Sequence, residues 1–201
     1  MNKIQKEILI GKLLGDAHIS KISDTKARFQ IAQSDKQSEY VEHLYEIFKD
    51  LCGTAPKYNI GKYTTVYFNS LSSEELLDVY KMFINDNVKG VPQNIKELLT
   101  TRGLAYWFMD DGTSYYAKGR QSKNIKSSVL FCTDCFTKDD VELLIDTLKE
   151  NFNIQSSLSK PPTRKGYRIY IGTREAQKFY DIIEPFIIDS MRYKIKRPYI
   201  M

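Results

Sequence analysis

Two aspartates occupy matching positions in the two halves of the chain, and they are the strongest sign of chemistry in the sequence. Asp16 is the eighth residue of LIGKLLGDA, and Asp111 is the eighth residue of LAYWFMDDG. Each follows an apolar run typical of a helix, at the C-terminal end where the helix dipole disfavours negative charge. One such carboxylate alone would most simply be a solvated charge or a cap, but the recurrence predicts two similar halves that share one site. On a basic protein, a pair of carboxylates points to metal-dependent chemistry on phosphate.

A lysine recurs in the same way. Lys89 in the segment KGVP has an approximate counterpart in Lys194 of the segment KIKRP. Each lysine follows the last helix expected in its half. Either lysine alone could be a surface residue beside a turn, whereas the recurrence favours a shared role near the aspartates. Cys132 and Cys135 form a CxxC pattern, but the segment around them alternates like a strand, so the two thiols would point to opposite faces. We therefore interpret this pattern as only a weak metal or redox signal.

The elements that must position these residues repeat in the order helix, two strands, helix, two strands, helix. In the first helix, Gly11 and Gly15 lie four apart and would let another helix approach closely. Hydrophobic periodicity predicts helices at 4–15, 35–50, 73–84, 95–111, 138–151 and 174–183. It predicts strands at 18–23, 27–33, 63–69, 113–117, 127–133, 154–159 and 167–172. We expect an α+β protein of two pseudo-symmetric αββαββα half-domains, 1–88 and 95–201, joined by a linker at 89–94.

Composition narrows the class of protein. The 201 residues include 30 Lys and Arg against 25 Asp and Glu, which gives a modest net charge of +5. Two basic runs without acidic residues favour a nucleic-acid partner: Lys118, Arg120, Lys123 and Lys126, and Arg192, Lys194, Lys196 and Arg197. No apolar run reaches the roughly 18 residues that a membrane span needs, and the N-terminal segment reads as a helix rather than a signal peptide. We expect no membrane association and an intracellular protein, either in an organelle that encodes it or in a bacterial or archaeal cytoplasm.

These residues resemble the LAGLIDADG homing endonucleases, in particular the single-chain kind encoded in introns. The resemblance covers essentially the whole chain, and the eighth letter of the motif falls on Asp16 and on Asp111. It implies that the two motif helices pack side by side as the interface, and that two antiparallel four-stranded sheets form a saddle over the major groove of double-stranded DNA. It also implies a monomer that cuts both strands of a long, nearly asymmetric target of about 20 bp.

The resemblance also assigns roles to individual residues. Asp16 and Asp111 would be metal ligands, with Mg²⁺ as the expected cofactor and Mn²⁺ able to replace it. Lys89 and Lys194 match basic residues that line the solvent pocket and polarise the nucleophile or the transition-state charge. Gln33 matches a polar residue that organises the same waters. Its counterpart in the second half is Asp134, where an amide or another polar group is expected, and this difference puts equal cutting of the two strands in doubt.

Other features leave alternatives open. Tyr106 and Asp110 stand where the first motif has Gly11 and Gly15. Because Asp110 and Asp111 are neighbours, the sequence leaves open which of the two is catalytic, although position eight of the motif and the following glycine favour Asp111. His18 would be a DNA-facing or packing residue rather than a general base. A maturase that binds its host intron RNA, or a DNA-binding regulator, are the alternative functions. Intact acids in both motifs favour the nuclease, because neither alternative needs a metal pair.

Overall fold

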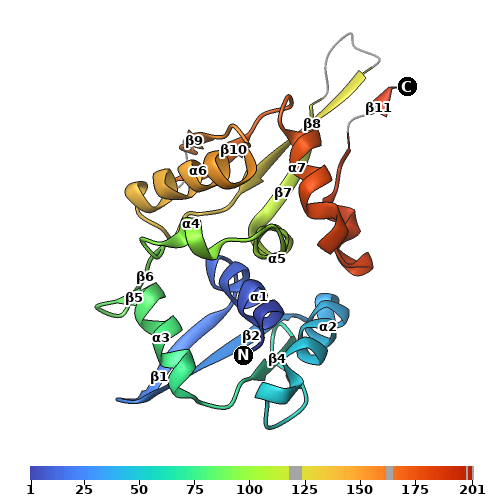
Figure 1. Cartoon of the computed structure of the whole chain (residues 1–201). Helices are drawn as coiled ribbons and strands as arrows, with labels where there is room; N and C mark the ends of the chain where they lie inside the picture. Colours follow the sequence, from blue (N-terminus) through green and yellow to red (C-terminus); the bar gives the residue numbers. More distant parts are fainter. Residues whose placement is uncertain (118–123, 162–164, 198, 201) are drawn as a thin grey trace.

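Two lobes of helices and strands meet along a pair of central helices (Figure 1). The structure is a computed structural model and describes the backbone of residues 1–117, 124–161, 165–197 and 199–200. The central helices are α1 (Lys3–Leu14) and α5 (Thr101–Asp111), one from each lobe, and they pack against each other along their length. The side chains of the predicted basic run 118–126 lie outside the described residues.

The first lobe is an antiparallel sheet covered on one face by helices. Its strands lie in the order β1 (His18–Ser23), β2 (Lys26–Ser34), β4 (Thr65–Asn69) and β3 (Lys57–Asn59). Alternate residues such as Phe29, Ile31 and Phe68 are buried, beneath α2 (Ser38–Phe48) and α3 (Glu74–Phe83). The intervening positions face away from the helices, as expected for a sheet with one packed face. Strand β3 is short and exposed, and hydrophobic alternation did not predict it.

The second lobe repeats this arrangement. Strands β7 (Gly112–Ala117), β8 (Asn124–Phe131), β10 (Arg168–Ile171) and β9 (Ser157–Ser159) follow the same antiparallel order. Helices α6 (Lys138–Phe152) and α7 (Ala176–Ile183) pack on this sheet, and the Thr137 side chain caps α6. A further strand, β11 (Tyr199–Ile200), pairs with the start of β8. The predicted four-stranded second sheet is therefore five-stranded, because the chain returns to pair with a part of β8 that extends beyond β10.

The prediction of one continuous helix over 95–111 was wrong. The structure has a single turn, α4 (Ile95–Leu98), and α5 begins only at Thr101. Leu99 and Thr100 are extended, and the Thr100 hydroxyl accepts a hydrogen bond from the Gly103 amide, which caps α5. The break matters for the site. Because α5 does not continue the axis of α4, it can take the direction in which it packs along α1.

Short elements complete the chain. A hairpin of β5 (Ile84–Asn85) and β6 (Val88–Lys89) follows α3, so Lys89 is held in a strand at the start of the predicted linker. The predicted helix over 35–50 consists of α2 with a 3-10 turn at each end, η1 (Asp35–Gln37) and η2 (Lys49–Leu51). Two more 3-10 segments follow α7, namely η3 (Glu184–Phe186) and η4 (Asp189–Lys194). The boundaries of the two half-domains stay a prediction.

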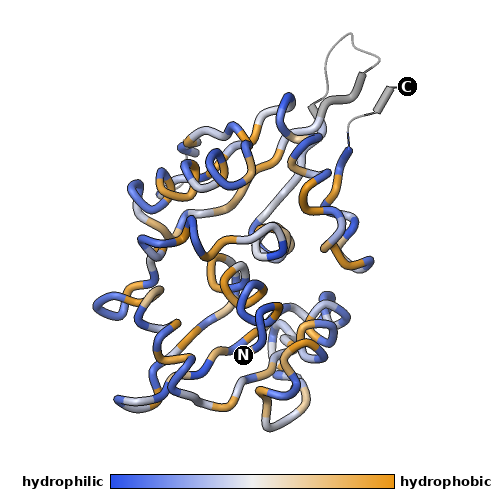
Figure 2. The backbone as a smooth tube through the Cα atoms, in the orientation of Figure 1, coloured by the Kyte–Doolittle hydropathy of each residue, from blue (hydrophilic) through white to orange (hydrophobic). Residues whose placement is uncertain are grey.

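The core runs through both lobes and across the central helices. Both central helices contribute fully buried residues, such as Leu9 and Leu104, although orange segments alternate with white and blue ones along these helices (Figure 2). Trp107 is fully buried, and the centroid of its ring lies 4.2 Å from the ring centroid of Phe131. This contact packs α5 against the second sheet. In the part of the chain that the structure describes, no helix is long and apolar enough to cross a membrane.

Candidate active site at the ends of the central helices

Glycines allow the two central helices to approach at backbone distance. A Cβ atom on Gly11 would lie 2.0 Å from the carbonyl oxygen of Gly103, and one on Gly15 would lie 2.6 Å from the side chain of Asp110. Real side chains do not tolerate such distances, so both positions require glycine. The predicted role of Gly11 and Gly15 in close helix packing is confirmed. The second helix uses Gly103, one turn earlier, because Tyr106 stands where α1 has Gly11.

The close packing brings the two motif aspartates to the same end of the helix pair. Asp111 is the last residue of α5, and Asp16 lies two residues beyond the end of α1. Asp16 is exposed, whereas Asp111 is only partly exposed. Burial, followed by the nearby charges of Asp16 and Asp110, raises the pKa of the Asp111 carboxyl to about 7. Three carboxyl groups therefore share one small region, and their mutual repulsion favours a cation there.

Each recurring lysine binds the C-terminal end of the motif helix of its own half. The ammonium of Lys89 donates to the carbonyls of Gly15 at 2.8 Å and Ala17 at 3.3 Å, just after α1. The ammonium of Lys194 donates to the carbonyls of Asp110 at 2.8 Å and Phe108 at 3.4 Å, and also to that of Met109. Carbonyls at the C-terminal end of a helix generally lack amide donors within the helix, so a cation there supplies donors and interacts favourably with the helix dipole; the Phe108 carbonyl also accepts from the Gly112 amide.

Burial lowers the pKa of both lysines, and nearby carboxylates oppose that effect. The carboxylates that act on Lys89 and on Lys194 include Asp16, Asp110 and Asp111. Both ammonium groups therefore lie within electrostatic reach of both motif aspartates. The structure brings together four of the predicted site residues: Asp16, Asp111, Lys89 and Lys194.

Gln33 joins this group, but Asp134 makes a different contact. The Gln33 amide donates to Asp16 Oδ2 at 2.9 Å. The Asp134 carboxylate instead accepts two bonds from Arg168 Nε, at 2.9 and 3.0 Å. Strand pairing explains the difference: His18 pairs with Gln30 and the equivalent Thr113 pairs with Leu130, so the position equivalent to Gln33 is Thr133. A functional role of Asp134 stays a prediction.

The residue that sequence reasoning left open, Asp110, is the most heavily bonded side chain of the region. Its side chain is fully buried and forms an ion pair with Lys12 at 2.5 Å, and Lys12 is equally buried. Tyr40 donates its hydroxyl to the same oxygen at 3.2 Å, and the Asp16 backbone amide donates to the other oxygen at 3.0 Å. The missed signal was Lys12 itself, because a lysine inside the apolar run of a buried helix requires an acidic partner.

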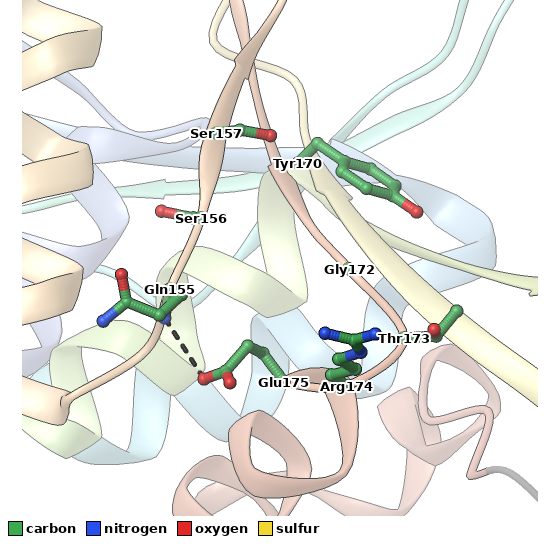
Figure 3. A pocket seen from close by; sticks show the side chains of 8 residues that line it. All are labelled: Gln155, Ser156, Ser157, Tyr170, Gly172, Thr173, Arg174 and Glu175. Carbon is green, nitrogen blue, oxygen red and sulfur yellow. Dashed lines mark hydrogen bonds between the residues drawn. The ribbon is translucent and has the colours of Figure 1, made fainter.

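One depression on the surface lies away from these residues. It has a volume of about 530 Å³ and lies between β9, β10 and the start of α7, where Ser157, Tyr170 and Arg174 line it (Figure 3). The backbone N–H of Gln155 donates to the Glu175 carboxylate beside it (Figure 3). None of the predicted site residues lines this depression. A second depression, of about 460 Å³, is lined by Lys89. The other candidate residues form a group of side chains at the meeting point of two helix ends, and an open arrangement of this kind suits a substrate too large to be engulfed.

Comparison with known proteins gives a consistent picture. A sequence model described as the LAGLIDADG DNA endonuclease family matches residues 6–179. The chain is 31% identical to "Probable intron-encoded endonuclease 1" of Wickerhamomyces canadensis, over 97% of this chain and 85% of that protein. It is 28% identical to "Cytochrome b mRNA maturase bI2" of Debaryomyces hansenii, over 97% of this chain and 74% of that protein.

A solved structure agrees in fold across the chain. The homing endonuclease I-WcaI bound to its DNA recognition sequence superposes with a TM-score of 0.84 at 30% identity, over 98% of this chain and 87% of that chain. The match extends over both lobes and the central helices, which is the architecture that the two motifs predicted. The family match, the identity and the fold lead to one conclusion: this chain is a member of the LAGLIDADG DNA endonuclease family.

Proposed function

We propose that this protein is a homing endonuclease that makes a double-strand break at one long, nearly asymmetric DNA site. One observation carries the proposal: two aspartates from matched helix ends meet beside two lysines, in a chain of a DNA endonuclease family. We assign Asp16 and Asp111 as the metal ligands, one for each strand. Asp111 rather than Asp110 fits this role, because the oxygens of Asp110 are already bonded within the protein.

The donor set suits a hard divalent cation, and we propose Mg²⁺, with Mn²⁺ able to replace it. Among the described residues no three acidic, histidine or cysteine side chains form a ready-made metal site. Magnesium needs no such cage, because one or two carboxylates suffice when water and substrate phosphate supply the remaining oxygens. Burial, followed by the charges of Asp16 and Asp110, raises the pKa of Asp111 to about 7, and a bound cation would offset the repulsion between these carboxylates. When bound, the metal would make the attacking water more acidic and stabilise charge on the leaving oxygen.

We propose that the remaining side chains position these carboxylates and stabilise charge. Gln33 holds one oxygen of Asp16 and leaves the other oxygen of that carboxylate available. Lys89 and Lys194 fix the ends of α1 and α5 and place a positive charge beside each aspartate. Positive charge held rigidly in a partly buried position stabilises a developing negative charge better than a mobile surface lysine does.

The strand faces that point away from the helices suit double-stranded DNA. On the first sheet, Arg28, Gln30 and Tyr67 lie on this face, and on the second, Tyr115 and Tyr170 do. Side chains of these types form hydrogen bonds to base edges and phosphates. The two faces have different residues, which supports an asymmetric target and a monomeric protein that binds it. The cellular compartment stays a prediction.

The test is to find the break. The chain would be incubated with Mg²⁺ and genomic DNA of a host that lacks the intron, and the new DNA ends would be sequenced. We expect one discrete double-strand break, which disappears when EDTA replaces the metal and when Asp16→Asn replaces the wild type. The absence of any discrete site, or the same break from Asp16→Asn, would contradict the proposal.

The similarity to a cytochrome b mRNA maturase favours a second candidate, assistance in splicing of the host intron RNA. Splicing of that RNA in the presence of wild-type and Asp16→Asn protein separates the two functions. A maturase keeps its effect on splicing in the variant, because RNA folding does not need the metal ligands.

A further inference from the structure

We propose that Asp110 is a positioning residue for the Asp16 side of the site, although it belongs to the other half of the chain. Together with Lys12 it forms a buried ion pair that fixes the Asp16 carboxylate, and no equivalent pair occurs on the Asp111 side among the described residues. Loss of the pair would therefore slow the cut made with Asp16 and leave the cut made with Asp111 nearly unchanged. This inference rests on the proposed nuclease function.

The contacts of Asp110 lead to Asp16 by two routes. The first is direct: the Asp16 backbone amide donates to Asp110 Oδ2 at 3.0 Å, which fixes the turn that follows α1. The second runs through Gln33, whose amide lies 2.9 Å from Asp16 Oδ2 and 3.5 Å from Asp110 Oδ1. One buried carboxylate from α5 thus restrains both the backbone and the side chain of Asp16.

The other partners of Asp110 hold it in place. Lys12 Nζ lies 2.5 Å from Asp110 Oδ1, and both side chains are fully buried. Tyr40 donates its hydroxyl to this oxygen, and the Lys12 ammonium lies 4.7 Å from the centre of the Tyr40 ring. Residues from α1, α2 and α5 therefore converge on one carboxylate. A charged group with this many fixed partners has little freedom to move.

Stability alone does not account for this arrangement. An apolar pair of similar volume often holds two elements together at least as well as a buried ion pair, because the desolvation of two charges offsets their attraction. Helix contact is already secured by Gly11 and Gly103 and by the apolar residues around them. The ion pair is better explained by what it orients, which is the turn that carries Asp16.

In the part of the chain that the structure describes, the Asp111 side of the site has no such pair. The position equivalent to Lys12 in the second motif is Trp107, whose indole nitrogen is buried without a hydrogen-bond partner, and the position equivalent to Asp110 in the first motif is Gly15. Asp111 itself lies near Lys89 and Lys194. Because the Lys12–Asp110 ion pair lies on the Asp16 side only, its removal should affect cleavage of the two DNA strands unequally.

The decisive variant replaces both charges with apolar groups, Lys12→Met with Asp110→Leu. It removes the acceptor for the Asp16 amide without leaving an unpaired charge in the interior. A matched variant, Lys12→Met with Asp110→Asn, keeps an oxygen acceptor of the same shape at position 110. A stability control, Ile169→Val, trims a buried side chain in the second sheet, remote from the site. If the apolar pair does not fold, Tyr40→Phe replaces it, since it removes only one donor to Asp110.

Each strand of a target duplex would carry its own end label, and single-turnover rates would be measured for the two cuts. In the apolar pair we expect one strand to be cut about 100-fold more slowly, as is typical for a misplaced catalytic group, with the other changed less than about threefold. Nicked DNA should accumulate. The Asn pair should recover most of the lost rate, Tyr40→Phe should show a smaller bias on the same strand, and Ile169→Val should show none. Equal slowing of both cuts, or an unchanged ratio, would overturn the inference.

A second measurement does not depend on cleavage. Amide hydrogen exchange, followed by NMR, should show a protected Asp16 amide in the wild type and in the Asn pair, and an unprotected one in the apolar pair. Unchanged protection would overturn the positioning role. If the wild type cuts no DNA while the Asp16 amide still loses protection in the apolar pair, then the nuclease proposal fails and the positioning contact stands.

Discussion

Replacement of Asp111 by asparagine should stabilise the metal-free protein, and the gain should depend on pH. Burial and two neighbouring carboxylates raise the pKa of Asp111 from its ordinary value of 3.8 to about 7. A raised carboxyl pKa means that the folded state binds the proton more tightly than the unfolded state. The ionised form therefore destabilises the fold, by an amount that is absent below about pH 4 and grows until the pH passes about 7.

The size of the effect follows from the two pKa values. The interval from 3.8 to about 7, at about 1.4 kcal/mol for each pH unit, gives a ceiling of about 4 kcal/mol. Asp111 is partly exposed, so solvent screening reduces the expected value to about 2 kcal/mol. Asparagine has the same shape and no charge, so it should recover this free energy at pH 8 and none of it at pH 4.

Urea unfolding in EDTA measures the difference, with fluorescence of the buried Trp107 as the signal. At pH 8 the midpoint of Asp111→Asn should lie about 1 M above that of the wild type, for a denaturant slope of about 2 kcal/mol per M. At pH 4 the two midpoints should coincide. Added Mg²⁺ should stabilise the wild type more than the variant, since a ligand stabilises the state that binds it. A variant that is no more stable at pH 8, or equally stabilised at both pH values, would refute the reasoning.

Three further predictions concern the site and the interface. Replacement of Lys89 or Lys194 by methionine should lower the single-turnover cleavage rate by about 10- to 1000-fold, as expected for one electrostatic stabiliser, and unchanged rates would return both to surface lysines. Gly11→Ala should cost about 3 kcal/mol in urea unfolding, because the new Cβ would meet the Gly103 carbonyl at 2.0 Å, and wild-type stability would exclude the described packing. DNA footprinting of the monomer should protect about 20 bp, with affinity that falls steeply with salt, and a footprint of about 10 bp would contradict the use of both sheets.

Local patterns in the sequence predicted most of the fold. The two motifs, the repeated order of elements and the glycines at positions 11 and 15 follow from periodicity and side-chain size, which act over a few residues. The structure differs where tertiary pairing decides. Strand β3 is too short and too exposed to show alternation, and β11 has only two residues. Both strands form because a longer neighbour offers a free edge. The break before α5 depends on one capping hydroxyl, that of Thr100.

The site was predictable where its residues recur in both halves. Asp16, Asp111, Lys89 and Lys194 each have a counterpart, so the repeat reveals them. The counterpart of Gln33 was displaced by one residue, because strand register cannot be read from similar letters and a single-residue shift moves a side chain to the other face. The role of Asp110 could not be predicted, because its partner Lys12 belongs to the other half of the chain. No regular spacing in the sequence indicates a contact between these two residues.

The Lys12–Asp110 contact also dictates which central helices can pair when the halves are made as separate chains. Two copies of α1 brought together in the same way would bury each lysine opposite a glycine, without an anion. Two copies of α5 would bring two Asp110 carboxylates into one dry interface, with Tyr106 in place of the glycine that permits close approach. Unpaired buried charge disfavours both like combinations, whereas the mixed pair satisfies each group. Separately expressed halves should therefore assemble as heterodimers, and a split form of this protein would select its own correct partner.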